Sequence, residues 1–194
     1  LDGGGDTGYT KLDFMTKLRY AFSDAHALEF KYSMTDEISN ETYLGLSEVD
    51  YSDNPLRRYR ATALDEMDAD HSQVTLSYAI KLADNMSIAV VGYSNDFARN
   101  WYKLNKVNGE KLSMIAKPTD AGFGDFYLLM NAQDSADDAY RIKANNREYY
   151  SSGIQAVLNV QTDGGHDIQA GMRIHSDEMD RFQWEDRYGM QSGQ

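Results

Sequence analysis

Cysteine is absent from this chain, and so are any long apolar run and any excess of positive charge. The lack of cysteine excludes disulfides, zinc–thiolate sites and thiol nucleophiles, and it fits a protein that crosses an oxidising periplasm. No run approaches the roughly 18 apolar residues that a membrane-spanning helix needs, so a helical membrane protein is excluded. The net charge of -12 argues against a nucleic-acid partner, because binding to phosphates needs a basic surface.

Motifs for catalysis are also missing. The 4 histidines are scattered, and neither a G-x-S-x-G elbow nor an H-E-x-x-H helix occurs. We therefore expect no enzyme, and a barrel-borne hydrolase is kept only as an alternative because serine and histidine are both available. His175 and the acidic residues that follow it suggest a metal site, but their side chains would alternate between the two faces of a strand. We expect neither a metal nor a cofactor.

What the chain does contain is a strict alternation of apolar and polar residues, over a length of 194 residues that suffices for one domain. The pattern is clearest in residues 153–188, where two alternating segments flank the turn cluster 162–166 and predict an antiparallel hairpin. Alternation also predicts earlier strands, at 10–22, 28–34, 73–80 and from residue 86 to 103.

The connections between these segments alternate in length. Short turns and long irregular segments follow one another along the chain: 23–26, 36–70, 81–85, 104–146 and 162–166. In an up-and-down meander every second connection lies at the same end, so the short turns share one rim and the long loops the other. We further expect one helical turn around 61–67, and a bulge or twist at Gly92.

The sequence thus predicts an all-β antiparallel meander of about six strands, a sector of a larger transmembrane β-barrel, because about eight strands are the fewest that close. The functional surface is expected at the long-loop rim. The alternative is a soluble or surface-attached β-sandwich that binds a ligand without transporting it, since its strands alternate too. Exposure of the apolar faces on one curved sheet would favour the barrel, and a covering second sheet would favour the sandwich.

Three segments resemble a known family: TYLGLSEVDYSDNPLRRY (42–59), NDFARNWYKL (95–104) and GMRIHSDEMDRFQWEDRYGM (171–190). They are similar to TonB-dependent outer-membrane receptors, in the branch that includes ferric dicitrate and siderophore receptors. The resemblance implies a barrel of about 22 strands with an N-terminal plug domain. It further implies import of ferric chelates across the outer membrane of a Gram-negative bacterium, energised by the TonB complex through a short N-terminal box.

On this basis residues 1–194 are expected to be part of a receptor barrel domain, without the plug and without the TonB box. Both ends look cut from a longer polypeptide, so we expect a piece of a longer chain. The partners implied are a ferric chelate, outer-membrane lipid and lipopolysaccharide, and the TonB complex through the missing N-terminal region.

A local positive cluster lies in the first long segment of this acidic chain. Many iron chelates are anionic, and guanidinium groups match carboxylate geometry with two parallel hydrogen bonds. The candidate ligand-binding residues are therefore Tyr43, Arg57, Arg58, Tyr59 and Arg60. Alternatively, the arginines pair with nearby acids such as Asp50, Asp53 or Asp65, or meet lipopolysaccharide phosphates at the rim.

Aromatic residues gather near the ends of two expected strands. Trp101 and Tyr102 lie near the end of one strand, and Tyr149 and Tyr150 precede the final hairpin. Aromatic residues of membrane barrels concentrate at the two bilayer surfaces. We therefore expect these four residues to form a membrane-surface belt rather than a substrate site.

Overall fold

The computed structural model describes residues 6–112 and 124–192, so the expected N-terminal loop and the ends of the chain lie partly outside the described residues. The strands are β1 (Tyr9–Ser23), β2 (His26–Ser39), β3 (Glu66–Ala83), β4 (Met86–Val107), β5 (Glu110–Lys111), β6 (Tyr140–Gln161) and β7 (Asp167–Tyr188). Within the described residues the helical segments are α1 (Glu48–Asp53), the 3-10 turn η1 (Arg60–Thr62) and α3 (Gly124–Met130). None of the described helices is long and apolar enough to cross a membrane.

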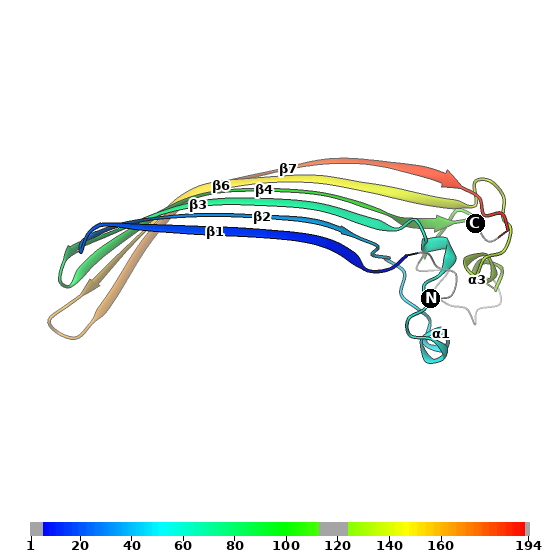
Figure 1. The fold of residues 1–194 in the computed structure, drawn as a ribbon, viewed down its shortest axis with the longest axis horizontal. Helices are drawn as coiled ribbons and strands as arrows, with labels where there is room; N and C mark the ends of the chain where they lie inside the picture. Colours follow the sequence, from blue (N-terminus) through cyan, green and yellow to red (C-terminus); the bar gives the residue numbers. More distant parts are fainter. Residues whose placement is uncertain (1–5, 113–123, 193–194) are drawn as a thin grey trace.

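The strands form one antiparallel sheet in the order β1-β2-β3-β4-β6-β7, with the two-residue β5 paired to the end of β4. Spatial neighbours are therefore sequence neighbours, as an up-and-down meander requires. The short turns lie at one end of the long, bent sheet, and both long loops lie at the other end (Figure 1). The predicted all-β meander is confirmed, and the sheet is open.

The register places the apolar side chains of all six long strands on the same face, which we call the apolar face. One row across the sheet consists of Leu18, Phe30, Leu76, Gly92, Ile154 and Ile174. These side chains are not covered by a second sheet in the described part of the chain, and Leu18 and Ile174 are 64% and 65% exposed. The apolar faces thus lie open on a single sheet, which contradicts the sandwich alternative.

The opposite face, which we call the polar face, carries cross-strand hydrogen bonds and ion pairs. Lys17 pairs with Glu29 at 3.0 Å, and the Asn95 amide donates to Ser151 at 3.1 Å. Because side chains alternate along a strand, one backbone presents both surfaces. The sheet is therefore two-sided in chemistry along its whole width.

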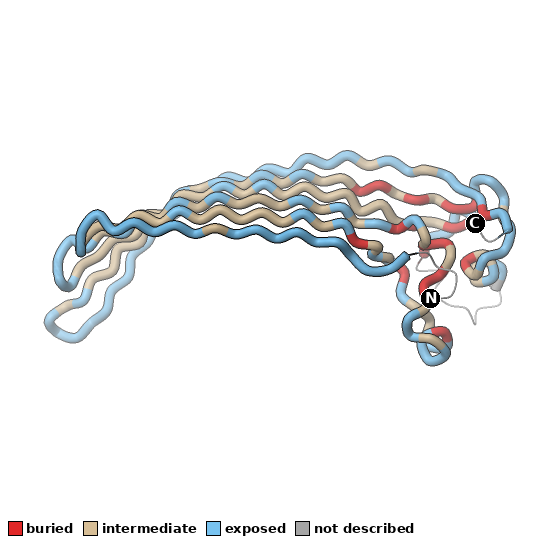
Figure 2. The backbone as a smooth tube through the Cα atoms, in the orientation of Figure 1, coloured by how far each residue is buried: buried red, intermediate tan, exposed pale blue. Residues whose placement is uncertain are grey.

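Within residues 6–112 and 124–192, the compact core lies at the loop end of the sheet. Leu104 and Val107 of β4 and Ile142 of β6 are fully or almost fully buried beneath Tyr59 and Met130 of the two long loops. Figure 2 shows the buried residues gathered at this end, while the remainder of the sheet is exposed or half-buried. The loops are thus packed onto the sheet instead of extending freely.

The strands are longer than the alternation predicted. β2 runs to Ser39 and β3 begins at Glu66, so strand pairing continues through segments expected to be irregular. Backbone hydrogen bonds do not require apolar side chains, and the apolar period alone therefore stops short of the strand ends. For the same reason β4 runs to Val107 and β6 begins at Tyr140.

Two local expectations need correction. No register shift occurs at Gly92, which pairs regularly with Leu76 and Ile154; the shift in β4 lies between Leu104 and Lys106. The phase is ambiguous there because apolar Val91 and Tyr93 lie on the polar face, not because the strand bulges. The helical turn expected around 61–67 is the shorter η1, and α1 and α3 were not expected.

Candidate functional site

A buried carboxylate at the end of the first loop fixes that loop to the sheet. Asp65 is 1% exposed and accepts hydrogen bonds from the Leu104 backbone N–H at 2.7 Å and from the Thr42 hydroxyl at 3.0 Å. Burial raises the pKa of Asp65 to about 6, although these bonds and the charge of Arg58 oppose the shift. Asp65 therefore holds the chain immediately before Tyr43 against β4.

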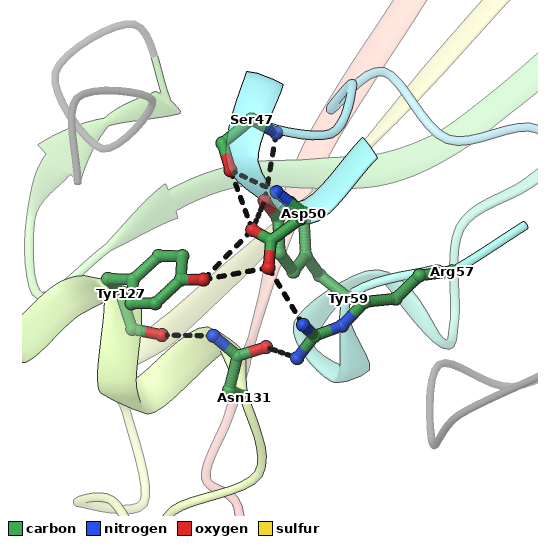
Figure 3. A network of polar contacts seen from close by, with 6 residues as sticks. All are labelled: Ser47, Asp50, Arg57, Tyr59, Tyr127 and Asn131. Carbon is green, nitrogen blue, oxygen red and sulfur yellow. Dashed lines mark hydrogen bonds and ion pairs between the residues drawn. The ribbon is translucent and has the colours of Figure 1, made fainter. Parts of the chain in front are cut away.

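A second buried carboxylate joins the two long loops (Figure 3). Asp50 in α1 accepts hydrogen bonds from Tyr59 at 2.5 Å, from Ser47 at 2.7 Å, and from Tyr127 of α3 at 2.8 Å, and it pairs with Arg57 at 2.7 Å. Burial acts to raise the pKa of Asp50, but the three hydroxyl donors and Arg57 outweigh it and lower the pKa below its ordinary value. Asp50 is thus a charged hub between loops that are distant in sequence.

The candidates from the first loop are largely engaged in building it. Arg57 reaches Asp50 and the Asn131 side chain, which is the pairing with a loop acid weighed as the alternative. Arg58 is 4% exposed and donates to the backbone carbonyls of Asp65 and Asn40, and to those of Asp6 and Thr62. Tyr59 is buried with its hydroxyl on Asp50.

The other two candidates lie in different places. Arg60 borders an apolar hollow with Leu64, Tyr140 and Met190. Tyr43 is exposed and lies near Trp101 of β4, with the ring centroids 5.6 Å apart. The structure therefore does not bring the five residues into one cluster.

A lysine is held between two aromatic rings beside Tyr43. Lys103 Nζ lies 3.7 Å from the centroid of Tyr43 and 3.9 Å from that of Trp101. An ammonium group over an aromatic face is attracted by the ring quadrupole, so the two rings fix the position of the charge. The Trp101 indole N–H also points to the Glu41 carbonyl at 3.4 Å, which links β4 to the first loop.

Lys103 belongs to a larger group of cations on the polar face, which we call the basic cluster. Arg99, Arg147 and Arg181 lie side by side on β4, β6 and β7, and Lys103 lies directly opposite Lys143. None of the five forms an ion pair with a carboxylate in the described ranges. Like charges directly opposite each other on a sheet are destabilising, so this arrangement favours an added anion.

The electrostatics and shape of the cluster agree with that view. The pKa of Lys103 is lowered, mainly by burial and then by the positive charges of Arg99, Lys143 and Arg147. Lys103 lies nearer the loops than the apolar part of its strand does. The buried Arg147 Nε has no hydrogen-bond partner among the described residues. A hollow of about 410 Å³ opens here, bordered by Tyr43, Lys103, Lys143, Arg147 and Arg181. It can hold an anion through several charge-assisted hydrogen bonds.

The four expected belt residues divide between the two faces. Trp101 and Tyr149 lie on the polar face, where Tyr149 stacks on Phe97 at 5.8 Å. Tyr102 and Tyr150 share the apolar face. The Tyr102 hydroxyl donates to Asp186 at 2.9 Å. This pair lies nearer the loops than the apolar residues that line the short-turn half of the same face.

Reasoning from the sequence missed the basic cluster. Its members are far apart in the chain, and Lys143 falls in a segment expected to be irregular. The sequence did contain one signal for it. Arg99, Trp101 and Lys103 occupy every second position of their strand, so their side chains lie on the same, polar face. No group of three or more potential ligands for a metal ion occurs within residues 6–112 and 124–192.

Comparisons with known proteins locate the fold. No protein-family model and no curated protein matches the chain. Among solved structures, the chain is similar to the ferric citrate transporter FecA in its unliganded form, with 16% identity and a TM-score of 0.66 over 93% of this chain. The chain spans 22% of the length of that transporter. The likeness shows that the open meander has the fold of a sector of a β-barrel of this kind.

Proposed function

We propose that this chain is part of a TonB-dependent receptor that binds an anionic ferric chelate, such as ferric citrate or a ferric siderophore, and imports it across the outer membrane of a Gram-negative bacterium. The observation that carries the proposal is the basic cluster. It lies at the loop end of the polar face, on a single sheet whose other face is openly apolar. A receptor wall needs both properties, because it meets lipid on one side and an anion on the other.

The apolar face supports the membrane placement. In the short-turn half of the sheet its apolar residues are not interrupted by carboxylates, and toward the loops carboxylates appear among them, with Asp36 directly opposite Asp70. Paired carboxylates are costly in hydrocarbon, so we place the end of the lipid contact before them. Tyr150 lies next to this limit, at the height of a membrane-surface belt, and the acids beyond it face lipopolysaccharide. The TonB complex would act through regions outside residues 1–194.

The polar face supports capture of an anion. The guanidinium groups of Arg147 and Arg181 and the ammonium groups of Lys103 and Lys143 border one hollow. Arg99 lies beside Arg147 in the same row, and planar guanidinium forks suit carboxylates. We assign Tyr43 to the ligand contact because it lies in the same hollow and positions Lys103. Arg57, Arg58 and Tyr59 act indirectly, by keeping the two loops folded beside the hollow. We assign no ligand contact to Arg60, which borders a different hollow.

The test uses the full-length receptor in cells. Arg99, Arg147 and Arg181 are replaced together by Gln, and Lys31→Gln is the matched control, because Lys31 shares the polar face but lies in the short-turn half. Each lost contact to an ionised group costs about 1.5–3 kcal/mol, which is roughly tenfold or more in affinity. We expect surface binding of radiolabelled ferric citrate to weaken at least about 100-fold in the triple variant and to stay unchanged in the control.

Two results would contradict the proposal. Equal affinity in the triple variant and the wild type would remove the basic cluster from the binding site. Saturable binding without any energised uptake by the wild type would instead support the alternative of a binding module without transport.

A further inference from the structure

A tyrosine in the middle of the polar face reaches across a neighbouring strand. Tyr93 of β4 lies over Gly153 of β6, and its hydroxyl is 2.8 Å from His175 Nδ1 on β7. A Cβ atom at Gly153 would lie 2.4 Å from this hydroxyl oxygen and 2.7 Å from the Ile174 carbonyl oxygen. The glycine therefore leaves the passage through which one side chain connects three strands.

Two side chains of β7 contact the Tyr93 hydroxyl. Arg173 Nε, which can only donate, donates to the Tyr93 oxygen at 2.8 Å. The Tyr93 hydroxyl also forms a hydrogen bond with His175 Nδ1, and His175 Nε2 lies 3.6 Å from Asp177. The Arg173 guanidinium also lies 5.3 Å from the Tyr93 ring centroid. Two contacts to the same phenol thus fix the orientation of Arg173.

This orientation leaves binding groups available. The two terminal nitrogens of Arg173 make no hydrogen bond and no ion pair within the described part of the chain. Gln155 lies directly opposite on β6, and its amide group has no hydrogen-bond partner there either. A guanidinium fork beside an amide donor can bind a carboxylate with three hydrogen bonds.

The position of these groups relates them to the basic cluster. Arg173 and Arg181 lie on the same face of β7, eight residues apart, which is about 26 Å at about 3.3 Å per residue. Arg173 lies nearer the short turns than Arg181 does. At this height the opposite face of the sheet is apolar. On β4, β6 and β7, Arg173 is therefore the next arginine or lysine of the polar face that an anion would meet on its way from the basic cluster toward the short turns.

We propose that Arg173 and Gln155, held in place by Tyr93 across Gly153, form a second anion site that binds a carboxylate of the chelate during its passage. This inference rests on the proposed function and adds a step to it, because the basic cluster captures the chelate and Arg173 receives it. Loss of the second site then slows uptake without weakening capture.

The experiment compares Arg173→Gln with Arg19→Gln in the full-length receptor. Arg19 lies in the same row on the same face, at the opposite edge of the sheet and away from the phenol, which makes it a matched control. Surface binding of radiolabelled ferric citrate is measured in cells without energy, and uptake is measured in energised cells. For Arg173→Gln we expect uptake to fall about tenfold with unchanged surface affinity, and for Arg19→Gln we expect no change in either.

The site could also bind a carboxylate that belongs to the receptor itself, and thermal unfolding separates the two sources. Tyr93→Phe removes the bond to the phenol but leaves the charge of Arg173. If cargo is the source, the unfolding temperature of unliganded Arg173→Gln should be no lower than that of Tyr93→Phe. A lower temperature would overturn the proposal in favour of an internal carboxylate.

The remaining outcomes also decide the matter. Uptake by Arg173→Gln equal to that of Arg19→Gln would overturn the second site while leaving the proposed function intact. A proportional loss of surface binding would place Arg173 in capture and would also overturn it. Failure of the wild type to bind ferric citrate would overturn the proposed function and this inference together. If Arg173→Gln does not reach the membrane, Tyr93→Phe takes its place, with a smaller loss of uptake expected.

Discussion

The Asp50 hub predicts that a change in one long loop loosens the other. Tyr127 belongs to α3, and its hydroxyl donates to both Asp50 oxygens, at 2.8 and 2.9 Å. Tyr127→Phe removes this donor but keeps the ring, which lies 6.4 Å from the ring of Tyr59. The perturbation is therefore confined to one hydrogen bond between the loops.

The expected size follows from the surroundings of Asp50. Asp50 is 3% exposed and charged, and a hydrogen bond to a buried charged group contributes about 1.5–3 kcal/mol. Removing the whole carboxylate with Asp50→Ala should cost more, about 3–5 kcal/mol, because Arg57 would be left unpaired. The free energy at stake is that of local opening of the loops, since the long strands do not depend on Asp50.

Hydrogen exchange followed by mass spectrometry measures local opening directly. In the full-length protein, Tyr127→Phe should speed exchange of backbone amides in residues 47–60 by about tenfold or more. Tyr51→Phe is the matched control, because Tyr51 lies in the same α1 helix but is 62% exposed. Unchanged exchange in 47–60, or an equal change in Tyr51→Phe, would refute the view that Asp50 couples the loops.

Three further predictions concern single residues. The pKa of Asp65 in the folded protein is about 6, above the ordinary 3.8, so the free energy of unfolding should fall by roughly 3 kcal/mol as the pH rises from about 4 to about 6. Asp65→Asn should remove this fall, as measured by thermal unfolding at several pH values. Gly153→Ala should destabilise the barrel by about 1–3 kcal/mol in urea unfolding, because its Cβ meets the Tyr93 hydroxyl and a backbone carbonyl. Under the proposed function, Tyr43→Ala should weaken ferric citrate binding, whereas Tyr51→Ala, in the same loop but outside the hollow, should not.

The sequence was most informative where one face of a strand is apolar. The pattern in β2 predicts both the strand and its apolar face, because a strand exposes every second side chain to one environment. The residues that form this pattern are Leu28, Phe30, Tyr32 and Met34. The signal disappears at Asp36, where both faces become polar. The backbone pairing continues to Ser39, so strand ends beyond the apolar section could not be predicted from alternation.

The candidate site was harder to predict, for a related reason. Arg57 and Arg58 are adjacent in sequence and attract attention as a positive cluster, yet the fold directs both guanidinium groups to acceptors within the loops. Arg99, Arg147 and Arg181 are isolated in sequence and meet only through the register of β4, β6 and β7. Arginines that are close in sequence therefore belong to the packing of the loop. Arginines at alternate positions of separate strands form the basic cluster on the polar face.

Under the proposed function, the length of the strands explains why a site can be built beyond the membrane without depending on loops alone. β4, β6 and β7 each have 22 residues, about 70 Å of strand, whereas the apolar band of a membrane barrel is about 25 Å tall. Even tilted by about 40°, such strands would extend well past the hydrocarbon layer of a bilayer. The basic cluster lies on these extensions, where backbone pairing holds each arginine in register. A slip of one residue in β6 would move Arg147 to the apolar face, so the specificity of the site depends on the same pairing that builds the wall.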